Sequence, residues 1–215
     1  MRFRSRSALR LLLALAVGVL PLTGCTEEQP SQTADTTTAQ TTPSSPRTTV
    51  ADTAVDADVP YVATPNETVR GMLELADVSG EDVVYDLGSG DGRIPIAAAH
   101  RYGARGVGIE IKPSLVDRAR KNAKLSGVQD QVTFRRQDIF EADFSEATVV
   151  TMYLFPEVNL KLRPMLFEQL DPGTRVVSHS FDMNGWAPDS TTEVDGDVLY
   201  LWTIPEEVPD HLREE

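Results

Sequence analysis

An aspartate and three alternating glycines follow a short apolar stretch in the first half of the chain. Asp86 comes after the strand-type residues 83–85, and the glycines stand at positions 88, 90 and 92, before a helix-like segment over 94–99. This order predicts a strand, a tight turn and a helix N-terminus. Glycines in such a turn allow positive φ and leave bare backbone against a ligand, and the free N–H groups of the first helical turn face the same ligand. The pattern predicts a nucleotide-like ligand.

The spacing of the glycines argues against two common nucleotide sites. A dinucleotide fingerprint needs glycine where this chain has Arg93, and a phosphate-binding loop needs Gly-Lys followed by Ser or Thr. A carboxylate at Asp86 would repel a pyrophosphate, whereas it suits a ligand that carries an ammonium and a sulfonium. The alternative is a glycine-rich loop that binds nothing.

A second acidic residue stands where a ribose site requires one. Residues 106–111 form the next strand-type run, and Glu110 lies near its end, 24 positions after Asp86. An acid at the end of the second strand, roughly 20 residues beyond a glycine turn, is placed to accept both hydroxyls of a ribose. The two features together predict a nucleoside ligand with a cationic end.

The pattern Asp-x-Gly-x-Gly-x-Gly over residues 86–92 resembles the first motif of class I S-adenosylmethionine-dependent methyltransferases. The resemblance implies a Rossmann-like α/β fold, with a mostly parallel seven-stranded sheet and a C-terminal antiparallel hairpin. It implies S-adenosyl-L-methionine as cofactor and an adenine site at the end of the third strand, and no metal site is predicted. The predicted cofactor-binding residues are Tyr61, Thr64, Asp86, Gly88, Ser89, Gly90, Glu110, Asp138 and Ile139.

A narrower resemblance rests on residues 60–65, Pro-Tyr-Val-Ala-Thr-Pro, together with residues 86–93. These stretches are similar to bacterial relatives of mitochondrial enzymes that methylate lysines of the adenine nucleotide translocase and of the ATP synthase c-subunit. In such families the segment before the first strand often closes over the cofactor, which makes Tyr61 and Thr64 candidates. The alternative is a purely local role, with Thr64 capping a helix that begins at Pro65 and with Tyr61 as a hydrophobic staple.

Periodicity places the elements that must position these residues. Apolar spacing predicts helices over 65–80, 113–126 and 156–170, with Leu125 on the sheet-facing side of the second of these. Strand patterns cover 132–137, 147–153 and 175–181, and a hairpin joins 191–194 to 198–204.

Candidates for the methyl-acceptor side come from the ends of the fourth and fifth predicted strands. Tyr153 ends the fourth, and His179 and Asp182 lie at the end of the fifth. An aromatic face, an imidazole and a carboxylate suit an amine that must lose a proton. The Pro-Pro-aromatic sequence typical of enzymes that methylate planar nitrogens is absent, so the predicted acceptor is an amine, with a protein lysine ahead of a small amine. The alternatives are a core aromatic for Tyr153 and a structural role for His179.

The N-terminus differs in character from the predicted domain. Four arginines, an apolar run over 11–20 and Leu-Thr-Gly-Cys ending at Cys25 resemble a bacterial lipoprotein signal, the alternative being an ordinary secretory signal. The resemblance implies a signal peptide over 1–24, lipidation at Cys25, and a domain anchored to the membrane of the bacterial cell envelope, outside the cytoplasm. The Thr-, Ser- and Pro-rich residues 25–58 predict a disordered tether, and residues 59–215 the methyltransferase domain.

The charge of the chain argues against nucleic acid as a partner. Residues 1–24 hold four of the 20 lysines and arginines and none of the 33 aspartates and glutamates, which leaves the rest at a net charge of −17. A monomer is expected. Because S-adenosylmethionine is made in the cytoplasm, a second function is open: a lipid-anchored, non-catalytic binding module that retains the methyltransferase fold.

Overall fold

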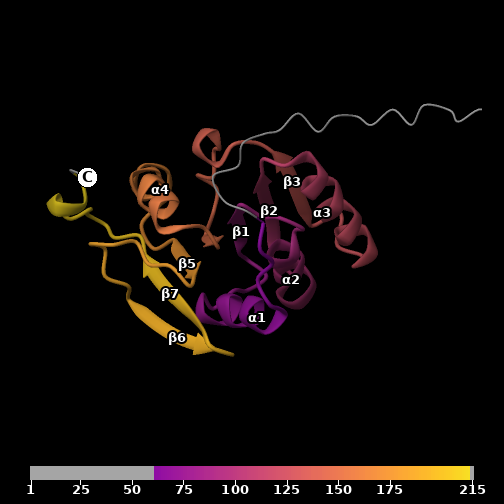
Figure 1. The fold of residues 1–215 in the computed structure, drawn as a ribbon, viewed down its shortest axis with the longest axis horizontal. Coiled ribbons are helices and arrows are strands. Elements are labelled where there is room, and N and C mark those ends of the chain that lie inside the picture. Colours follow the sequence, from indigo (N-terminus) through magenta and orange to yellow (C-terminus); the bar gives the residue numbers. More distant parts are fainter. Residues whose placement is uncertain (1–60, 214–215) are drawn as a thin grey trace, which may run out of the picture. The chain divides into compact units, whose positions relative to one another are not determined.

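The computed structural model describes residues 61–213. The predicted signal peptide, Cys25, the tether and the domain boundary at 59 lie outside these residues. The described chain folds around one seven-stranded sheet of order β3-β2-β1-β4-β5-β7-β6 (Figure 1). Strands β1 to β5 are parallel to one another, while β7 is antiparallel to both β5 and β6. This confirms the predicted α/β fold with its C-terminal antiparallel hairpin.

The elements follow the predicted order. The strands are β1 (Val83–Leu87), β2 (Arg105–Glu110), β3 (Val132–Arg136), β4 (Val149–Met152), β5 (Arg175–His179), β6 (Ser190–Val194) and β7 (Asp197–Thr203). The helices are α1 (Asn66–Leu75), α2 (Arg93–Tyr102), α3 (Pro113–Leu125) and α4 (Pro156–Gln169), with short 3-10 turns η1 (Ile139–Glu141) and η2 (Asp210–Leu212).

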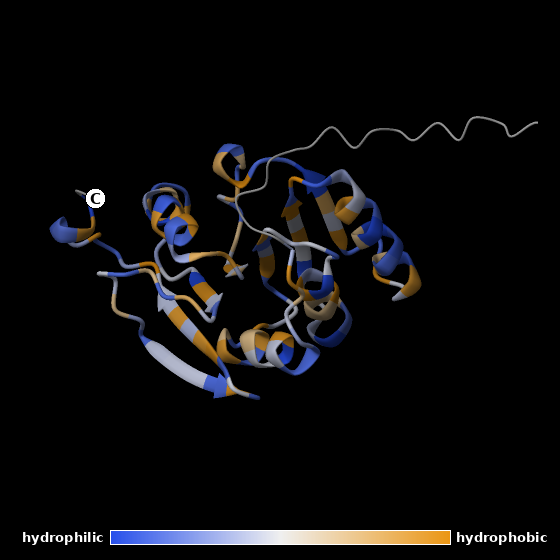
Figure 2. Ribbon diagram, viewed as in Figure 1, coloured by the Kyte–Doolittle hydropathy of each residue, from blue (hydrophilic) through white to orange (hydrophobic). Residues whose placement is uncertain are grey.

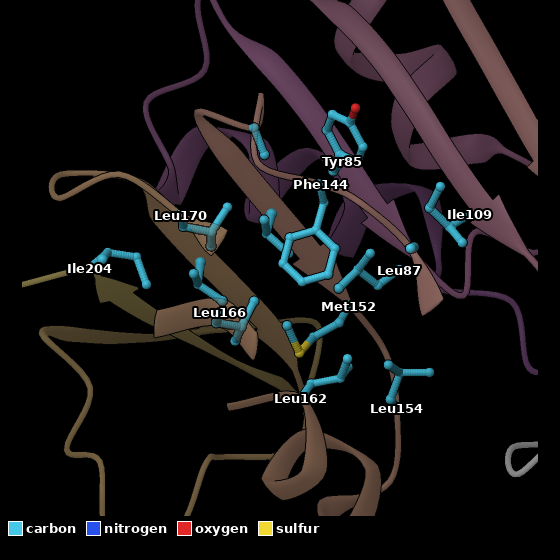
Figure 3. Close-up of a cluster of buried hydrophobic side chains, with 14 of the residues drawn as sticks. Tyr85, Leu87, Ile109, Phe144, Met152, Leu154, Leu162, Leu166, Leu170 and Ile204 are labelled. Carbon is cyan, nitrogen blue, oxygen red and sulfur yellow. The ribbon is translucent and has the colours of Figure 1, made fainter. Parts of the chain in front are cut away.

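Alternating strand residues divide the core between the two faces of the sheet. On one face, Val84, Val149 and Val177 of three adjacent strands pack with α1 and α2. On the other face, Tyr85 and its neighbours pack with α4 and with Phe144 (Figure 3). Because both faces are covered, the central strands β1 and β4 are almost entirely buried, as expected of a parallel sheet.

The hairpin strand β6 has a different character because it forms an edge. It is pale to blue in the hydropathy colouring, whereas β7 beside it is largely orange (Figure 2). Its residues Ser190, Thr191 and Glu193 are exposed. Polar and charged side chains on an edge strand disfavour pairing with another chain.

Two local predictions about helices are wrong. Helix α1 ends at Leu75 rather than near residue 80, because Asp77 adopts a left-handed φ of 50° and terminates it. Leu125 was expected on the sheet-facing side of α3, but its side chain is 76% exposed. It follows Ala123 by two positions, which places it on the helix face opposite the buried Leu115, Val116, Ala119 and Ala123.

A polar cluster ties the amino ends of β1, β4 and β5 together. Asp82 Oδ1 accepts a hydrogen bond from Thr148 Oγ1 at 2.7 Å and also pairs with the guanidinium of Arg175. Asp82 Oδ2 accepts from the backbone N–H and the hydroxyl of Ser79. Burial tends to raise the pKa of Asp82, but these hydrogen bonds and the Arg175 charge outweigh it and lower the pKa. The cluster lies at the sheet edge opposite the glycine turn.

Candidate active site

The glycine turn joins β1 to α2 at the carboxyl edge of the sheet. Gly88, Gly90 and Gly92 have φ values of 80°, 52° and 79°, in the left-handed region that favours glycine. A Cβ atom at Gly90 would lie 2.3 Å from Cε2 of Tyr61. Only a residue without a side chain therefore fits beneath the Tyr61 ring.

Glu110 is fixed between this turn and the start of α3. Its carboxylate is 7% exposed, with Oε2 accepting from the Gly90 N–H at 2.9 Å and Oε1 from the Lys112 N–H at 2.8 Å. Each carboxylate oxygen has a further lone pair. The carboxylate is therefore preorganised to accept hydroxyl groups from a ligand in the cleft, as predicted for a ribose.

Asp86 is the most strongly perturbed acid of the site. It is 3% exposed, and its Oδ1 accepts a hydrogen bond from Thr151 Oγ1 of β4 at 2.7 Å. Burial raises the pKa of Asp86 to about 7; Thr151 opposes the shift, and the negative charges of Glu110 and Asp91 add to it. Among residues 61–213, no lysine or arginine contributes to lowering this pKa. A cationic ligand would supply the missing charge.

The segment before α1, residues 61–65, is called the strap because it lies against the glycine turn. Arg93 holds it: Nη1 donates to the Thr64 carbonyl at 2.8 Å, while Nε and Nη2 donate to the two carboxylate oxygens of Asp91 at 2.9 and 2.7 Å. Burial tends to raise the pKa of Asp91, but the hydrogen bonds and charge of Arg93 outweigh it and lower the pKa. The strap is thus bound to the same turn that carries Gly90.

Thr64 does not cap α1, so the capping alternative is wrong. Pro65 occupies the cap position, and no side chain caps the helix. Thr64 is 4% exposed, and its Oγ1 lies 3.3 Å from Nδ1 of His179 on β5. Tertiary contact with the imidazole has replaced the local cap.

The third acid, Asp138, precedes η1 at the end of β3. Its Oδ1 accepts from the Phe140 N–H at 2.9 Å, so the side chain caps η1. Asp138, Ile139 and Phe140 line the same cleft as the glycine turn. This arrangement gives one acid and two apolar side chains at the place expected for an adenine.

These features surround a single cleft of about 930 Å³, part of which is open to solvent. All nine predicted cofactor-binding residues line it, as does Tyr153. The cleft fits a cationic nucleoside: bare glycine backbone, a buried carboxylate without a cation, and the Ser89 hydroxyl, which is buried and has no hydrogen-bond partner within residues 61–213. The further lining residues are Val62, Ala63, Asp91, Arg93, Ile94, Ile111, Lys112, Leu115, Phe140, Leu154 and Val158.

The three predicted catalytic residues take different places. Tyr153 lines the cleft, and its ring packs against the imidazole of His179 with centroids 3.8 Å apart and planes inclined by 33°. His179 is 1% exposed and lies behind Tyr153 rather than in the cleft lining. Asp182 is exposed, does not line the cleft, and accepts a hydrogen bond from the Asn184 N–H at 3.2 Å. The fold therefore brings two of the three together.

Sequence reasoning missed three contributors to the site. Arg93 and Asp91 bind the strap, although both belong to the motif that predicted the turn. Thr151 binds Asp86 because the two residues are partners in the parallel register of β1 and β4. A signal for Thr151 was available, since a polar residue inside an otherwise apolar strand usually has a buried partner.

Comparison with known proteins agrees with this geometry. The model of the ANTKMT methyltransferase domain matches residues 86–190. A protein-lysine N-methyltransferase of Saccharolobus islandicus (strain REY15A) is 48% identical over 153 residues, covering 69% of this chain and 95% of that protein. The adenine nucleotide translocase lysine N-methyltransferase of Mus musculus is 37% identical over 147 residues, covering 68% of this chain and 63% of that protein, so less than two thirds of the mouse relative is represented.

A solved structure gives a similar result. A chain from Salinibacter ruber, described as an RNA methyltransferase in complex with S-adenosyl-L-homocysteine, is 67% identical to this chain, with a TM-score of 0.70. The match covers 71% of this chain and 100% of that chain. The present chain therefore belongs to the ANTKMT methyltransferase domain family, and it is an S-adenosylmethionine-dependent methyltransferase.

Proposed function

We propose that this enzyme methylates the side-chain amine of lysine in a protein. The observation that carries the proposal is the placement of Tyr153 in the wall of the cofactor cleft, at the end of β4. The similarity to the Saccharolobus protein-lysine N-methyltransferase supports the choice of acceptor. A non-catalytic binding module is not favoured, because relatives of this degree of similarity are enzymes.

The cofactor side of the cleft has the groups that the proposal requires. When bound, S-adenosylmethionine supplies a methyl group carried on a positively charged sulfur. The Asp86 carboxylate attracts the cationic end of the ligand, and Glu110 accepts from its ribose hydroxyls. The strap, held by Arg93, lies over the glycine turn, with the Tyr61 ring against Gly90.

The rim of the cleft suits an amine on a long aliphatic side chain. Tyr61 and Val62 of the strap are 36% and 61% exposed, and Phe155, directly after the lining residue Leu154, is 39% exposed. Aromatic faces attract an ammonium group, and an apolar surrounding lowers its pKa by desolvation. The first effect favours entry of a lysine ammonium, and the second favours loss of its proton before methyl transfer.

Methyl transfer to protein can be tested with the full-length enzyme. The enzyme is incubated with methyl-labelled S-adenosylmethionine and an envelope extract, and with Asp86→Ala as the inactive control. Label in protein that survives base treatment, and its recovery as methyllysine after hydrolysis, is the expected result. Because the Salinibacter chain is described as an RNA methyltransferase, a parallel sample receives ribonuclease: label lost by that treatment would make RNA the acceptor.

We also propose that Cys25, which lies outside the described residues, is lipidated. The lipid would anchor the domain to a membrane of the bacterial cell envelope, with the domain outside the cytoplasm. The signal-like sequence over residues 1–25 supports this proposal. Cys25→Ala should lose incorporation of a fatty-acid probe and move to the soluble fraction. Incorporation that persists in Cys25→Ala would contradict the anchor, and degradation of the wild-type domain by protease added to spheroplasts tests its side of the membrane.

A further inference from the structure

His179 lies beneath the cleft wall, and its contacts give it a role that its sequence position did not reveal. Its imidazole is 1% exposed, and one face is covered by Tyr153 at a centroid distance of 3.8 Å. The Tyr153 ring in turn faces Phe181, with centroids 6.2 Å apart and planes inclined by 18°. The position of the Tyr153 ring therefore depends on the imidazole that supports it.

Both ring nitrogens of His179 face side chains from other elements. Nδ1 lies 3.3 Å from Oγ1 of Thr64, and Nε2 lies 3.2 Å from Oδ2 of Asp197 at the start of β7, an ion-pair distance at which the ring N–H is not aligned for a hydrogen bond. The same Asp197 oxygen accepts a hydrogen bond from Thr68 Oγ1 of α1 at 2.9 Å. The imidazole is thus held from the strap, from α1 and from β7.

The chemistry of these partners selects one tautomer. An ionised carboxylate has no proton to donate, so the negative charge of Asp197 favours a proton on Nε2, and Nδ1 is left to accept from the Thr64 hydroxyl. Burial lowers the pKa of His179, and Asp197 opposes this shift. With both nitrogens facing protein partners and one face covered by Tyr153, the imidazole is poorly placed to remove a proton from an acceptor amine.

We propose that Asp197, Thr68 and Thr64 fix the Nε2–H tautomer of His179, and that His179 is a positioning residue that sets the Tyr153 ring in the acceptor wall of the cleft. This inference rests on the proposed methylation of an amine. Asp197 and Thr68 do not line the cleft, so they act only through the imidazole. The unit joins the strap, which lies against the glycine turn, to the Tyr153 wall of the cleft.

The tautomer can be read directly by NMR of full-length protein labelled with ¹⁵N-histidine. The chain has three histidines, and His100 and His211 are exposed, so the buried His179 is assigned by its loss in His179→Gln. We expect a protonated Nε2 and an unprotonated Nδ1 for His179 in the wild type, and a mixture of tautomers in Asp197→Ala. A protonated Nδ1 in the wild type would overturn the proposal.

Kinetics separate positioning from a merely structural role. Asp197→Ala should lower kcat/KM for a lysine-containing protein acceptor about tenfold, while the Kd of S-adenosylmethionine stays within about twofold. Asp197→Asn keeps an acceptor oxygen and should restore most of the rate. Thr68 contacts Asp197 rather than His179 itself, so Thr68→Val should lower kcat/KM only a few-fold. Thr68→Ser should restore it.

Two other outcomes have a definite meaning. Equal losses of acceptor turnover and cofactor affinity in Asp197→Ala, or no loss of either, would reject the positioning role. A wild-type enzyme that methylates no amine would remove the proposed function, yet the NMR spectra would still decide whether Asp197 fixes the tautomer.

Discussion

Two buried aspartates four positions apart lie at opposite ends of the parallel strands, and their pKa values are shifted in opposite directions. Asp82 and Asp86 are 7% and 3% exposed, and each accepts a 2.7 Å hydrogen bond from a β4-side threonine, Thr148 and Thr151 respectively. Asp82 also has Ser79 and Arg175, and its pKa is lowered. Asp86 is more deeply buried, and no lysine or arginine among residues 61–213 compensates its charge. Burial raises its pKa to about 7.

The comparison shows how one residue type serves stability at one edge and binding at the other. A buried carboxylate is costly unless a cation compensates it. At the amino edge, the cation belongs to the chain itself, so the compensation stabilises the fold. At the carboxyl edge, the cofactor would supply the cation, so its interaction with Asp86 contributes to the free energy of cofactor binding. Four predictions test this difference, from the largest expected effect to the smallest.

Replacing Asp86 by Asn should improve stability and nearly abolish binding. A raised folded-state pKa gives stability that is present below the unfolded value of 3.8 and lost as pH rises through about 7. At pH 8, Asp86→Asn should therefore be more stable to unfolding than the wild type, by up to about 4 kcal/mol, while losing affinity for S-adenosylmethionine about a hundredfold. Urea unfolding and calorimetry measure the two effects; a variant that is less stable at pH 8 would refute the comparison.

Replacing Arg175 by Met should lower stability and leave cofactor binding unchanged. The Asp82 carboxylate would remain buried without its cation, which should lower the free energy of unfolding by about 2–3 kcal/mol at pH 7, with cofactor affinity unchanged in the folded protein. The matched control is Arg105→Met, because Arg105 pairs with Glu146 at 3.5 Å on the surface, with side chains 64% and 68% exposed. That change should cost less than about 1 kcal/mol, and equal losses in both variants would contradict the assignment.

Cofactor affinity should depend on pH through Asp86. The cationic ligand prefers the ionised carboxylate, so affinity should rise about tenfold from pH 6 to pH 7.5, below the range in which the amino group of the ligand loses its proton. Isothermal titration at several pH values measures this. The control is Asp86→Asn, which should show a nearly flat profile, and an equally steep profile in that variant would assign the titration to another group.

The smallest effect should come from the two threonines. Thr151→Val removes the hydrogen bond that opposes the shift, so the pKa of Asp86 should rise further and cofactor affinity at pH 7 should fall about fivefold. Thr148→Val should instead lower stability by about 1 kcal/mol without changing affinity. Equal effects of the two substitutions on affinity would mean that the sheet edges are not functionally separate.

The sequence predicted most of the fold because its signals are local. Apolar and alternating patterns, with the hairpin turn for β6, placed all seven strands to within a few residues, and the glycine spacing after Asp86 located the turn. The two helix predictions that failed, at residues 76–80 and at Leu125, concern helix ends, where one left-handed residue such as Asp77 overrides the apolar pattern. Ends depend on a single backbone conformation, which periodicity does not report.

The cofactor side was predictable for the same reason, and the acceptor side was not. Asp86, Glu110 and Asp138 each lie within two residues of the carboxyl end of a parallel strand, which places them at one edge of the sheet. His179 also ends a strand, but its role depends on Thr64 and Asp197, which are 115 and 18 positions away. Spacing in the sequence carries no information about such contacts.

The sequence by itself therefore determined the sheet, the glycine turn and the three acids of the cofactor cleft, because strand order and turn geometry follow from local patterns. Only the tertiary structure decided which acid has a cation, which threonine binds which aspartate, and which nitrogen of His179 faces a carboxylate. Those properties depend on burial and on partners from distant elements. Burial and distant partners set both the pKa of a group and its orientation, and neither exists until the chain has folded.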